Sequence, residues 1–327
     1  MNIQRLVAVA LLSVLVLIGW FFTRSATDET LHTSIAVART PLSAPIFVAN
    51  DMGFFEKHQL DVTLLEVNGG HRSFRHMLDG SAQYGVSSEF VVTLGFFERQ
   101  DFSVLTSFAV SSNDIKVVAL KSSEIASFDD LAGKKIAYTK GSAGEYFLSS
   151  LLALQNIPAS AVFLVDTQPE EMLSVLKGRD VDVAVAWEPF VYEVLEALPE
   201  KITTLPTQNL YELSFLLTAL NTNALNTEVT QRLLLALADA VDFINQQPSE
   251  AKRLVKERLA LDDQVIDWLW DDYIFKLSLG QSLLITAENE AHWARSQNMV
   301  QSRDPLQVDK FFDSSALDQA LEAKVNH

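Results

Sequence analysis

The sequence predicts an α/β protein of two lobes, each built on a mixed, mostly parallel sheet with helices on its faces. Short apolar runs alternate with helical patterns from residue 34 to about residue 220, which is typical of such sheets. Residues 77–90 also match residues 175–190, with a glycine, a strand and a glutamate in the same order. At 327 residues the chain has room for two cores of ordinary domain size.

The first block alternates strands and helices up to residue 120. The run DVTLLEV at residues 61–67 predicts a strand because it is rich in β-branched and apolar residues and is followed by the turn Asn68-Gly69-Gly70. Gly80 ends the helix that precedes the next strand. The strands expected here are residues 34–39, 61–67, 84–87, 103–110 and 116–120, and the helices are residues 45–57, 73–79 and 89–98.

A second block begins at Ser127, where Asp129 and Asp130 indicate a short capped helix. The strands expected in it are residues 135–138, 162–165, 182–186 and 202–205, with helices from Ser142 onward and at residues 170–177 and 190–197. Residues 213–221 are expected to return to the first lobe as a strand. Helices at residues 227–247, 249–259, 263–273 and 286–298 should pack outside that lobe. Lobe 1 is thus expected to hold residues 31–118 and 213–327, and lobe 2 residues 119–212.

The first thirty residues predict export. Arg5 is followed by an apolar run at residues 6–22 that only Ser13 interrupts. The run is longer than the usual apolar part of a signal peptide and slightly shorter than a full membrane span, so cleavage and retention as an inner-membrane anchor both stay open. Either outcome places the remainder of the chain in the periplasm.

Composition excludes several classes of function. Lys and Arg number 25 against 42 Asp and Glu, a net charge of −17, so the surface repels phosphate backbones and nucleic-acid binding is not expected. The absence of cysteine excludes disulfides, thiolate metal sites, cysteine nucleophiles and a lipid-modified cysteine. The six histidines have no metal-site spacing and no serine lies in a nucleophile elbow, so we expect neither a metal nor a catalytic residue. No cofactor is expected.

Glu89 and Glu188 each come just after a predicted strand. In open α/β sheets, ligands bind outside the carboxyl ends of the strands, so two such lobes facing each other would line one shared ligand cleft. The ligand-binding residues predicted at this cleft are Thr40, Ser43, Asn68, Gly69, Arg72, Ser87, Ser88, Glu89, Gly141, Ser142, Trp187 and Glu188.

These residues point to two kinds of ligand group. The Gly141-Ser142 turn opens a helix, where backbone N–H groups suit an anion, and Arg72 is the cation predicted beside it. Trp187 can stack on a ligand, and the carboxylates of Glu89 and Glu188 can accept hydrogen bonds from an amine. Ser142 and Glu145 also fit a capping box, so a well-capped helix is the structural alternative for this turn, as a solvated arginine at a helix start is for Arg72.

From about Ser34 onward the chain resembles the substrate-binding proteins of ABC transporters for sulfonates, nitrate, taurine and thiamine-pyrimidine precursors. The resemblance rests on residues 45–58 (PIFVANDMGFFEKH), 77–80 (MLDG), 84–85 (YG), 128–137 (FDDLAGKKIA) and 187–189 (WEP). It implies a type II periplasmic-binding-protein fold that grips its ligand by hinge closure. A related branch makes the thiamine pyrimidine with a cysteine-rich iron site, which this chain lacks.

The sequence therefore predicts the solute-binding component of an ABC importer, acting as a monomer with an inner-membrane permease as its partner. A molecule that carries both an anion and an amine or heterocycle would satisfy both sets of residues. A membrane-anchored sensory ligand-binding protein is the alternative, and an enzyme on the same two-lobed scaffold is a third hypothesis.

Overall fold

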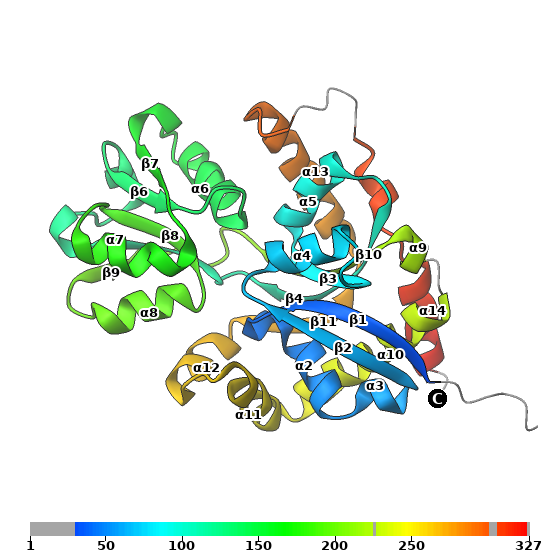
Figure 1. The fold of residues 1–327 in the computed structure, drawn as a ribbon. Coiled ribbons are helices and arrows are strands. Elements are labelled where there is room, and N and C mark those ends of the chain that lie inside the picture. The colour runs from blue at the N-terminus through cyan, green and yellow to red at the C-terminus, as the bar shows by residue number, and fades with distance from the viewer. Residues whose placement is uncertain (1–29, 225–226, 301–305, 326–327) are drawn as a thin grey trace, which may run out of the picture.

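The computed structural model describes residues 30–224, 227–300 and 306–325, which form two helix-covered sheets (Figure 1). The sheet of lobe 1 has the order β11-β4-β10-β3-β1-β2 and that of lobe 2 the order β7-β6-β8-β5-β9. The sheets are the centres of the two expected lobes.

The strands of lobe 1 are β1 (Leu31–Ala38), β2 (Leu60–Val67), β3 (Tyr84–Ser88), β4 (Phe102–Ser111), β10 (Leu213–Leu220) and β11 (Tyr273–Ser278). Strand β1 is parallel to β2 and β3, whereas β10 runs antiparallel to β3 and β4, and β11 antiparallel to β4. The register places Ile35 beside Leu64 in β2 and beside Tyr84 in β3. The carboxyl ends of β1, β2 and β3 therefore share one edge.

Two layers of helices cover this sheet. The helical segments of lobe 1 are η1 (Pro41–Ser43), α2 (Ala44–Asp51), α3 (Phe54–Lys57), α4 (Gly70–Leu78), α5 (Glu89–Glu98), α9 (Asn221–Ala224), α10 (Thr227–Gln246), α11 (Pro248–Leu259), α12 (Asp263–Trp270), α13 (Gln281–Ser296), η6 (Val308–Phe311) and α14 (Ser315–Val325). One core cluster joins α4, α5 and α13 to the sheet, and another joins it to α2 and α10. Both faces of the sheet are thus apolar, which explains its continuous hydrophobic runs.

Lobe 2 repeats this plan on a smaller scale. Its strands are β5 (Ile115–Leu120), β6 (Lys135–Tyr138), β7 (Phe163–Asp166), β8 (Val183–Trp187) and β9 (Ile202–Thr204). Its helical segments are η2 (Lys121–Ser123), η3 (Phe128–Leu131), α6 (Ala143–Leu154), η4 (Ala159–Ala161), η5 (Pro169–Glu171), α7 (Met172–Gly178) and α8 (Phe190–Ala197). Strand β6 is parallel to β7 and β8, whereas β5 is antiparallel to β8 and β9. Both sheets are mixed, with fewer parallel pairings than expected.

The chain crosses between the lobes twice. It leaves lobe 1 between β4 and β5 and returns between β9 and β10. The expected boundary at residues 118–119 falls inside β5, so the first crossing lies a few residues earlier. The two crossings touch, because the amide of Asn209 donates to the carbonyl oxygen of Ser112 at 3.0 Å. Two adjacent crossing segments are a suitable hinge.

Several elements differ from the sequence-based expectation, and the three longest differences are as follows. The helix expected at residues 45–57 is broken into α2 and α3 at Gly53, whose φ of 71° favours glycine. The helix expected at residues 263–273 ends at Trp270, and the antiparallel edge strand β11 follows it. Helix α14 was not expected at all.

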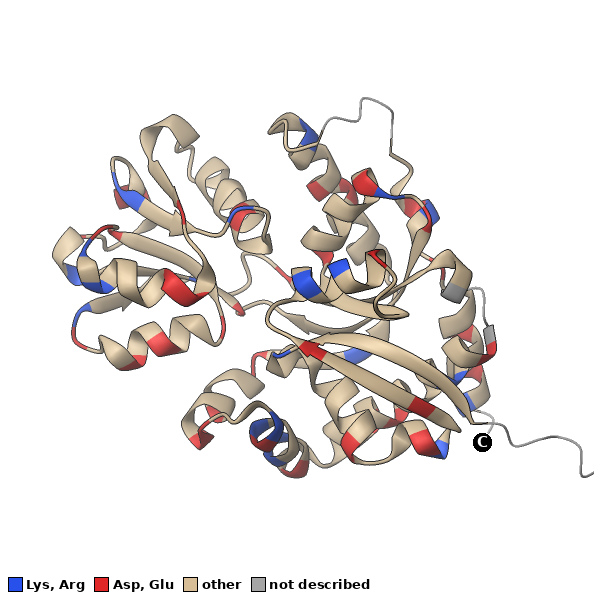
Figure 2. Ribbon diagram, in the orientation of Figure 1, with Lys and Arg blue, Asp and Glu red and all other residues tan. Residues whose placement is uncertain are grey.

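The N-terminal segment expected to direct export lies outside the described residues. Within the described ranges, no helix has the length and apolarity needed to cross a bilayer. Charged residues of both signs are interspersed over the two lobes (Figure 2).

Candidate ligand site between the lobes

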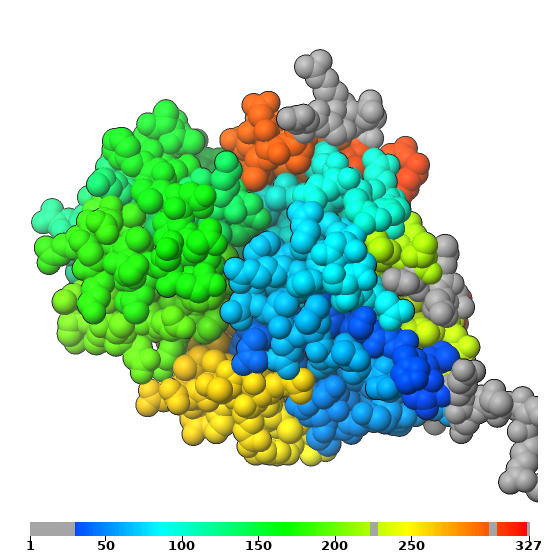
Figure 3. All heavy atoms as spheres, in the orientation of Figure 1, coloured from blue at the N-terminus to red at the C-terminus, as the bar shows by residue number. Residues whose placement is uncertain are grey.

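The strand ends of the two lobes face each other. Phe90, two residues after β3, stacks on Tyr146 of α6, with ring centroids 5.6 Å apart. The space-filling view shows the lobes in contact along a seam, with α11 and α12 beneath lobe 2 (Figure 3). The residues predicted from sequence follow these ends: Thr40 and Ser43 after β1, Asn68, Gly69 and Arg72 after β2, Ser87, Ser88 and Glu89 at β3, Gly141 and Ser142 after β6, and Trp187 and Glu188 at β8.

Helix α4 begins without a side-chain cap on the side of lobe 1 that faces lobe 2 (Figure 1). Its N-cap is Gly69, with a φ of 88°, and the first amide to bond within the turn is that of Ser73, 3.4 Å from the carbonyl oxygen of Gly69. The guanidinium of Arg72 is exposed and donates to the carbonyl oxygen of Asn68 at 2.9 Å. The helix start therefore presents backbone N–H groups and a cation, which together suit an anion.

Two predicted serines have buried hydroxyls without a hydrogen-bond partner among the described residues. Ser43 and Ser87 are each 0% exposed, and neither Oγ has a partner. Ser87 lies against the start of α4, because a Cβ built on Gly70 would be 2.8 Å from its Oγ. A buried hydroxyl without a partner is costly, and a bound ligand or water that accepts its hydrogen bond would remove that cost.

The start of α6 is the corresponding position in lobe 2. The expected capping box does not form, because Ser142 donates its hydroxyl to the carbonyl oxygen of Thr139 at 2.6 Å. Glu145 instead accepts from the amide of Gly141 at 2.7 Å, one residue earlier than a capping box requires. Trp187 is half-buried beside this turn, with Cε3 4.0 Å from a Cβ built on Gly144. The turn and the indole therefore lie close together.

Two other predicted residues lie at helix starts. Thr40 caps η1, since its Oγ1 accepts from the amide of Leu42 at 3.4 Å. Ser88 is the N-cap of α5, and its side chain makes no capping hydrogen bond. The hydroxyl of Thr40 thus has a structural role, whereas that of Ser88 does not cap its helix.

Glu89 lies in a buried carboxyl pair. One oxygen accepts from the amide of Ser214 at 2.7 Å, and the other accepts from the hydroxyl of Tyr211. The Tyr211 oxygen is also 3.1 Å from Oε1 of Glu290, whose Oε2 accepts from Thr93 at 3.0 Å. Burial raises the pKa of Glu89 to about 7, and burial beside Glu89 raises the pKa of Glu290 well above its ordinary value. Tyr211 and Glu290 carried no recognisable motif in the sequence.

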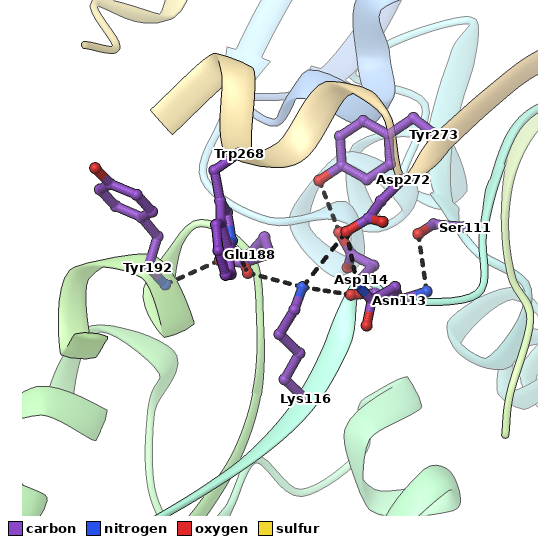
Figure 4. A network of polar contacts seen from close by, with 9 residues as sticks. All are labelled: Ser111, Asn113, Asp114, Lys116, Glu188, Tyr192, Trp268, Asp272 and Tyr273. Carbon is purple, nitrogen blue, oxygen red and sulfur yellow. Dashed lines mark hydrogen bonds and ion pairs between the residues drawn. The ribbon is translucent and has the colours of Figure 1, made fainter. Parts of the chain in front are cut away.

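Glu188 is 1% exposed and lies in a second polar network (Figure 4). Its Oε1 is 2.9 Å from Nζ of Lys116 and accepts from the indole N–H of Trp268 at 2.9 Å. Its Oε2 accepts from the amide of Tyr192 at 2.9 Å. Beside this group, burial raises the pKa of Asp114 to about 7, and the charge of Glu188 contributes to that increase. No local sequence pattern pointed to Lys116 or Trp268.

The predicted site residues thus offer more free hydrogen-bond donors than free acceptors. Two helix starts and the hydroxyl of Ser87 offer donors, whereas Glu89 and Glu188 are both buried and hydrogen-bonded within the protein. Ligand contact with these two carboxylates stays a prediction. Among the described residues, no group of three His, Asp or Glu side chains is arranged to hold a metal ion.

Comparison with known proteins places this geometry in context. The family model described as NMT1/THI5 like matches residues 40–251. A Brucella abortus (strain 2308) protein provisionally named a binding protein is 22% identical over 219 residues, which are 66% of this chain and 67% of that protein. A Bacillus subtilis (strain 168) protein provisionally named an aliphatic sulfonates-binding protein is 24% identical over 232 residues, 68% of this chain and 69% of that one.

Two solved structures share the fold. The alkanesulfonate-binding protein SsuA from Xanthomonas axonopodis pv. citri, bound to MOPS, has a TM-score of 0.76 at 15% identity, over 88% of this chain and 99% of that chain. The desulfurization enzyme DSZB has a TM-score of 0.66 at 13% identity, over 89% of this chain and 99% of that chain. The fold thus occurs in both a binding protein and an enzyme, so function must be argued from the site.

Proposed function

The chain belongs to the NMT1/THI5-like family, and from that premise we propose that it is the solute-binding component of an ABC importer for a small organic anion. The ligand is held between the lobes, which close by bending at the two crossing segments. The liganded protein then docks as a monomer on a permease in the inner membrane. Solved proteins of similar fold include a periplasmic sulphonate-binding and a periplasmic nitrate-binding protein, which supports this location.

The observation that carries the proposal is the hydroxyl of Ser87. It is buried, lacks a protein partner and lies beside the uncapped start of α4. A ligand oxygen held there would accept hydrogen bonds from the hydroxyl and from backbone N–H groups, and its charge would be favoured by the helix dipole and by Arg72. Binding would also relieve the cost of the unpartnered hydroxyl.

The same geometry favours a sulfonate, nitrate or related anion over an aminopyrimidine. An amine needs a free acceptor, yet the carboxylates of Glu89 and Glu188 are buried and already accept internal hydrogen bonds. The names of the Bacillus subtilis and Xanthomonas relatives agree with an anionic sulfonate. Trp187 is proposed to pack on the organic part of the ligand, beside the start of α6.

Native mass spectrometry and calorimetry test the proposal directly. The full chain, purified in detergent, is titrated with ethanesulfonate, taurine, MOPS, nitrate and a thiamine-precursor pyrimidine. A specific one-to-one complex with one of the anions is expected, and binding of the pyrimidine alone would overturn the anion assignment. Stimulation of a cognate permease ATPase by the liganded protein then separates transport from sensing by a membrane-anchored protein, which the apolar run at residues 6–22 would equally allow.

A further inference from the structure

Side-chain hydrogen bonds join the two lobes at several points. The indole N–H of Trp293 donates to Ser149 at 2.8 Å, and the hydroxyl of Tyr192 donates to Gln264 at 3.4 Å. One further bond ends on a buried carboxylate of lobe 2.

Trp268 belongs to α12 of lobe 1, and its indole N–H donates to Oε1 of Glu188 in lobe 2 at 2.9 Å. The two residues are 80 positions apart in the sequence. Figure 1 shows α12 beside α11 at the edge of lobe 1, below α8 of lobe 2. Movement of the lobes about the hinge must therefore keep or break this bond.

The acceptor is held rigidly from its own side. Lys116 on β5 is 4% exposed and lies 2.9 Å from the carboxylate of Glu188, and the amide of Tyr192 holds the second oxygen. All three of these groups belong to lobe 2 or to the strand that enters it. The carboxylate therefore keeps its position whether or not Trp268 is present, and it offers a fixed, charged acceptor to lobe 1.

The donor, in contrast, is partly open to water. Trp268 is 46% exposed, and its ring lies 5.8 Å from Nζ of Lys116 and 6.3 Å from the ring of Tyr192. Because water can replace Glu188 as the partner of the indole, breaking the contact costs less than breaking a fully buried one. The contact is thus suited to bias an equilibrium between lobe arrangements without locking it.

We propose that the Trp268–Glu188 hydrogen bond is an interlobe latch, and that Trp268 acts as a positioning residue for ligand binding without touching the ligand. Glu188 directly follows Trp187, the residue proposed to pack on the ligand. The latch therefore favours the arrangement in which the Trp187 side of the site faces lobe 1. Loss of the latch lowers the population of that arrangement, and apparent affinity falls in proportion.

A spin-label distance measurement on the unliganded full chain tests the latch. The chain has no cysteine, so Glu56→Cys in lobe 1 and Lys177→Cys in lobe 2 give two unique, exposed labelling sites. Trp268→Phe keeps an aromatic ring beside Lys116 and Tyr192 but removes the indole donor. Trp270→Phe is the matched control, because Trp270 is buried in lobe 1, where its ring packs 5.2 Å from Phe275.

A shifted or broadened distance distribution is expected for Trp268→Phe, with Trp270→Phe matching the parent. Trp268→Met repeats the test with a side chain that cannot donate. Identical distributions for all variants would overturn the latch. Affinity for ethanesulfonate should fall about three- to tenfold in Trp268→Phe through faster dissociation. That second readout rests on the proposed function, whereas the distance measurement decides the latch even if no sulfonate binds.

Discussion

Ser87 and Gly70 approach each other so closely that only glycine fits beside the serine. A Cβ at Gly70 would lie 2.8 Å from Oγ and 3.0 Å from Cα of Ser87. The second distance involves backbone, so rotation of the serine side chain cannot relieve it. The end of β3 therefore packs directly against the start of α4, where an anion is proposed to bind.

Gly70→Ala should displace the start of α4 from β3. We expect a loss of about 1–3 kcal/mol in the free energy of unfolding, as for other overpacked positions, together with at least tenfold weaker anion binding. Urea unfolding and calorimetry measure the two effects. Gly280→Ala is the control, since its φ is −70° and its nearest neighbour would be 3.4 Å away. Unchanged affinity in Gly70→Ala would place the ligand elsewhere.

Ser87→Ala should separate stability from binding. Removal of an unpartnered buried hydroxyl should leave the unliganded protein equally or more stable. Anion affinity should fall roughly tenfold or more, because the variant loses a hydrogen bond to a charged group. Ser73→Ala is the matched control, because the Ser73 hydroxyl donates to Ala36 at 2.6 Å and accepts from Val86 at 2.8 Å. That variant should lose stability. A destabilised Ser87→Ala would contradict the assignment.

Local sequence patterns were sufficient for most of the fold. Helices α5 and α8 and strand β6 have the bounds that apolar periodicity predicted. Strand β11 is hard to predict because it has only three inward residues and begins three residues after an amphipathic helix. The helical pattern therefore extends to Tyr273 in the sequence. Ile274 points outward in this strand and is 63% exposed although it is apolar. The segment therefore lacks the apolar–polar alternation that predicts a strand.

The site divides between local and distant determinants. Ser87 and the Asn68-Gly69-Gly70 turn could be predicted at one edge, because Ser87 ends one strand and the turn follows another, and the carboxyl ends of parallel strands share an edge. The partners of Glu188 could not be found this way. Trp268 is 80 positions away, and no spacing rule connects a helix of one lobe to a strand end of the other. The pairing follows only from how the lobes pack.

Lys116→Met should be strongly destabilising. Glu188, Asp114 and Asp272 would be left without their shared cation, and loss of one partner from a buried ion pair typically costs about 3–5 kcal/mol. Glu188→Gln should cost less, since Lys116 keeps Asp272 at 3.9 Å. The double variant should cost less than the sum of the two single losses.

Urea unfolding of the four proteins in this cycle measures the coupling. Lys252→Met is the control, because its partner carboxylates are exposed. It loses bridges of 3.2 and 3.7 Å to Asp267 and Asp271 and should cost less than about 1 kcal/mol. Strict additivity of the two single variants would show that the Lys116–Glu188 pair is not an energetic unit.

The Glu89–Glu290 pair should make stability fall as pH rises from about 5 to 7. The single proton of the Tyr211 hydroxyl can serve only one of its two carboxyl contacts, so the pair is satisfied best when one carboxyl is protonated. Burial raises the pKa of Glu89 to about 7, above the ordinary value that it has in the unfolded chain. Between those two values the folded state binds more protons than the unfolded state, so its advantage is full at low pH and is lost as pH approaches 7.

Each such proton contributes a slope of about 1.4 kcal/mol per pH unit. Asp114, with a pKa of about 7, adds to the slope with the same sign. Urea unfolding from pH 5 to pH 8 should therefore give a stability that falls with rising pH for the parent.

Glu89→Gln should give a shallower profile, because it removes one titrating group and also the charge that helps to raise the pKa of Glu290. Glu98→Gln, which loses only an exposed bridge to Arg75, should parallel the parent. A Glu89→Gln profile that also parallels the parent would mean that both carboxyls stay ionised in the folded protein. The free-energy cost of burying them would then be offset by interactions other than a shared proton.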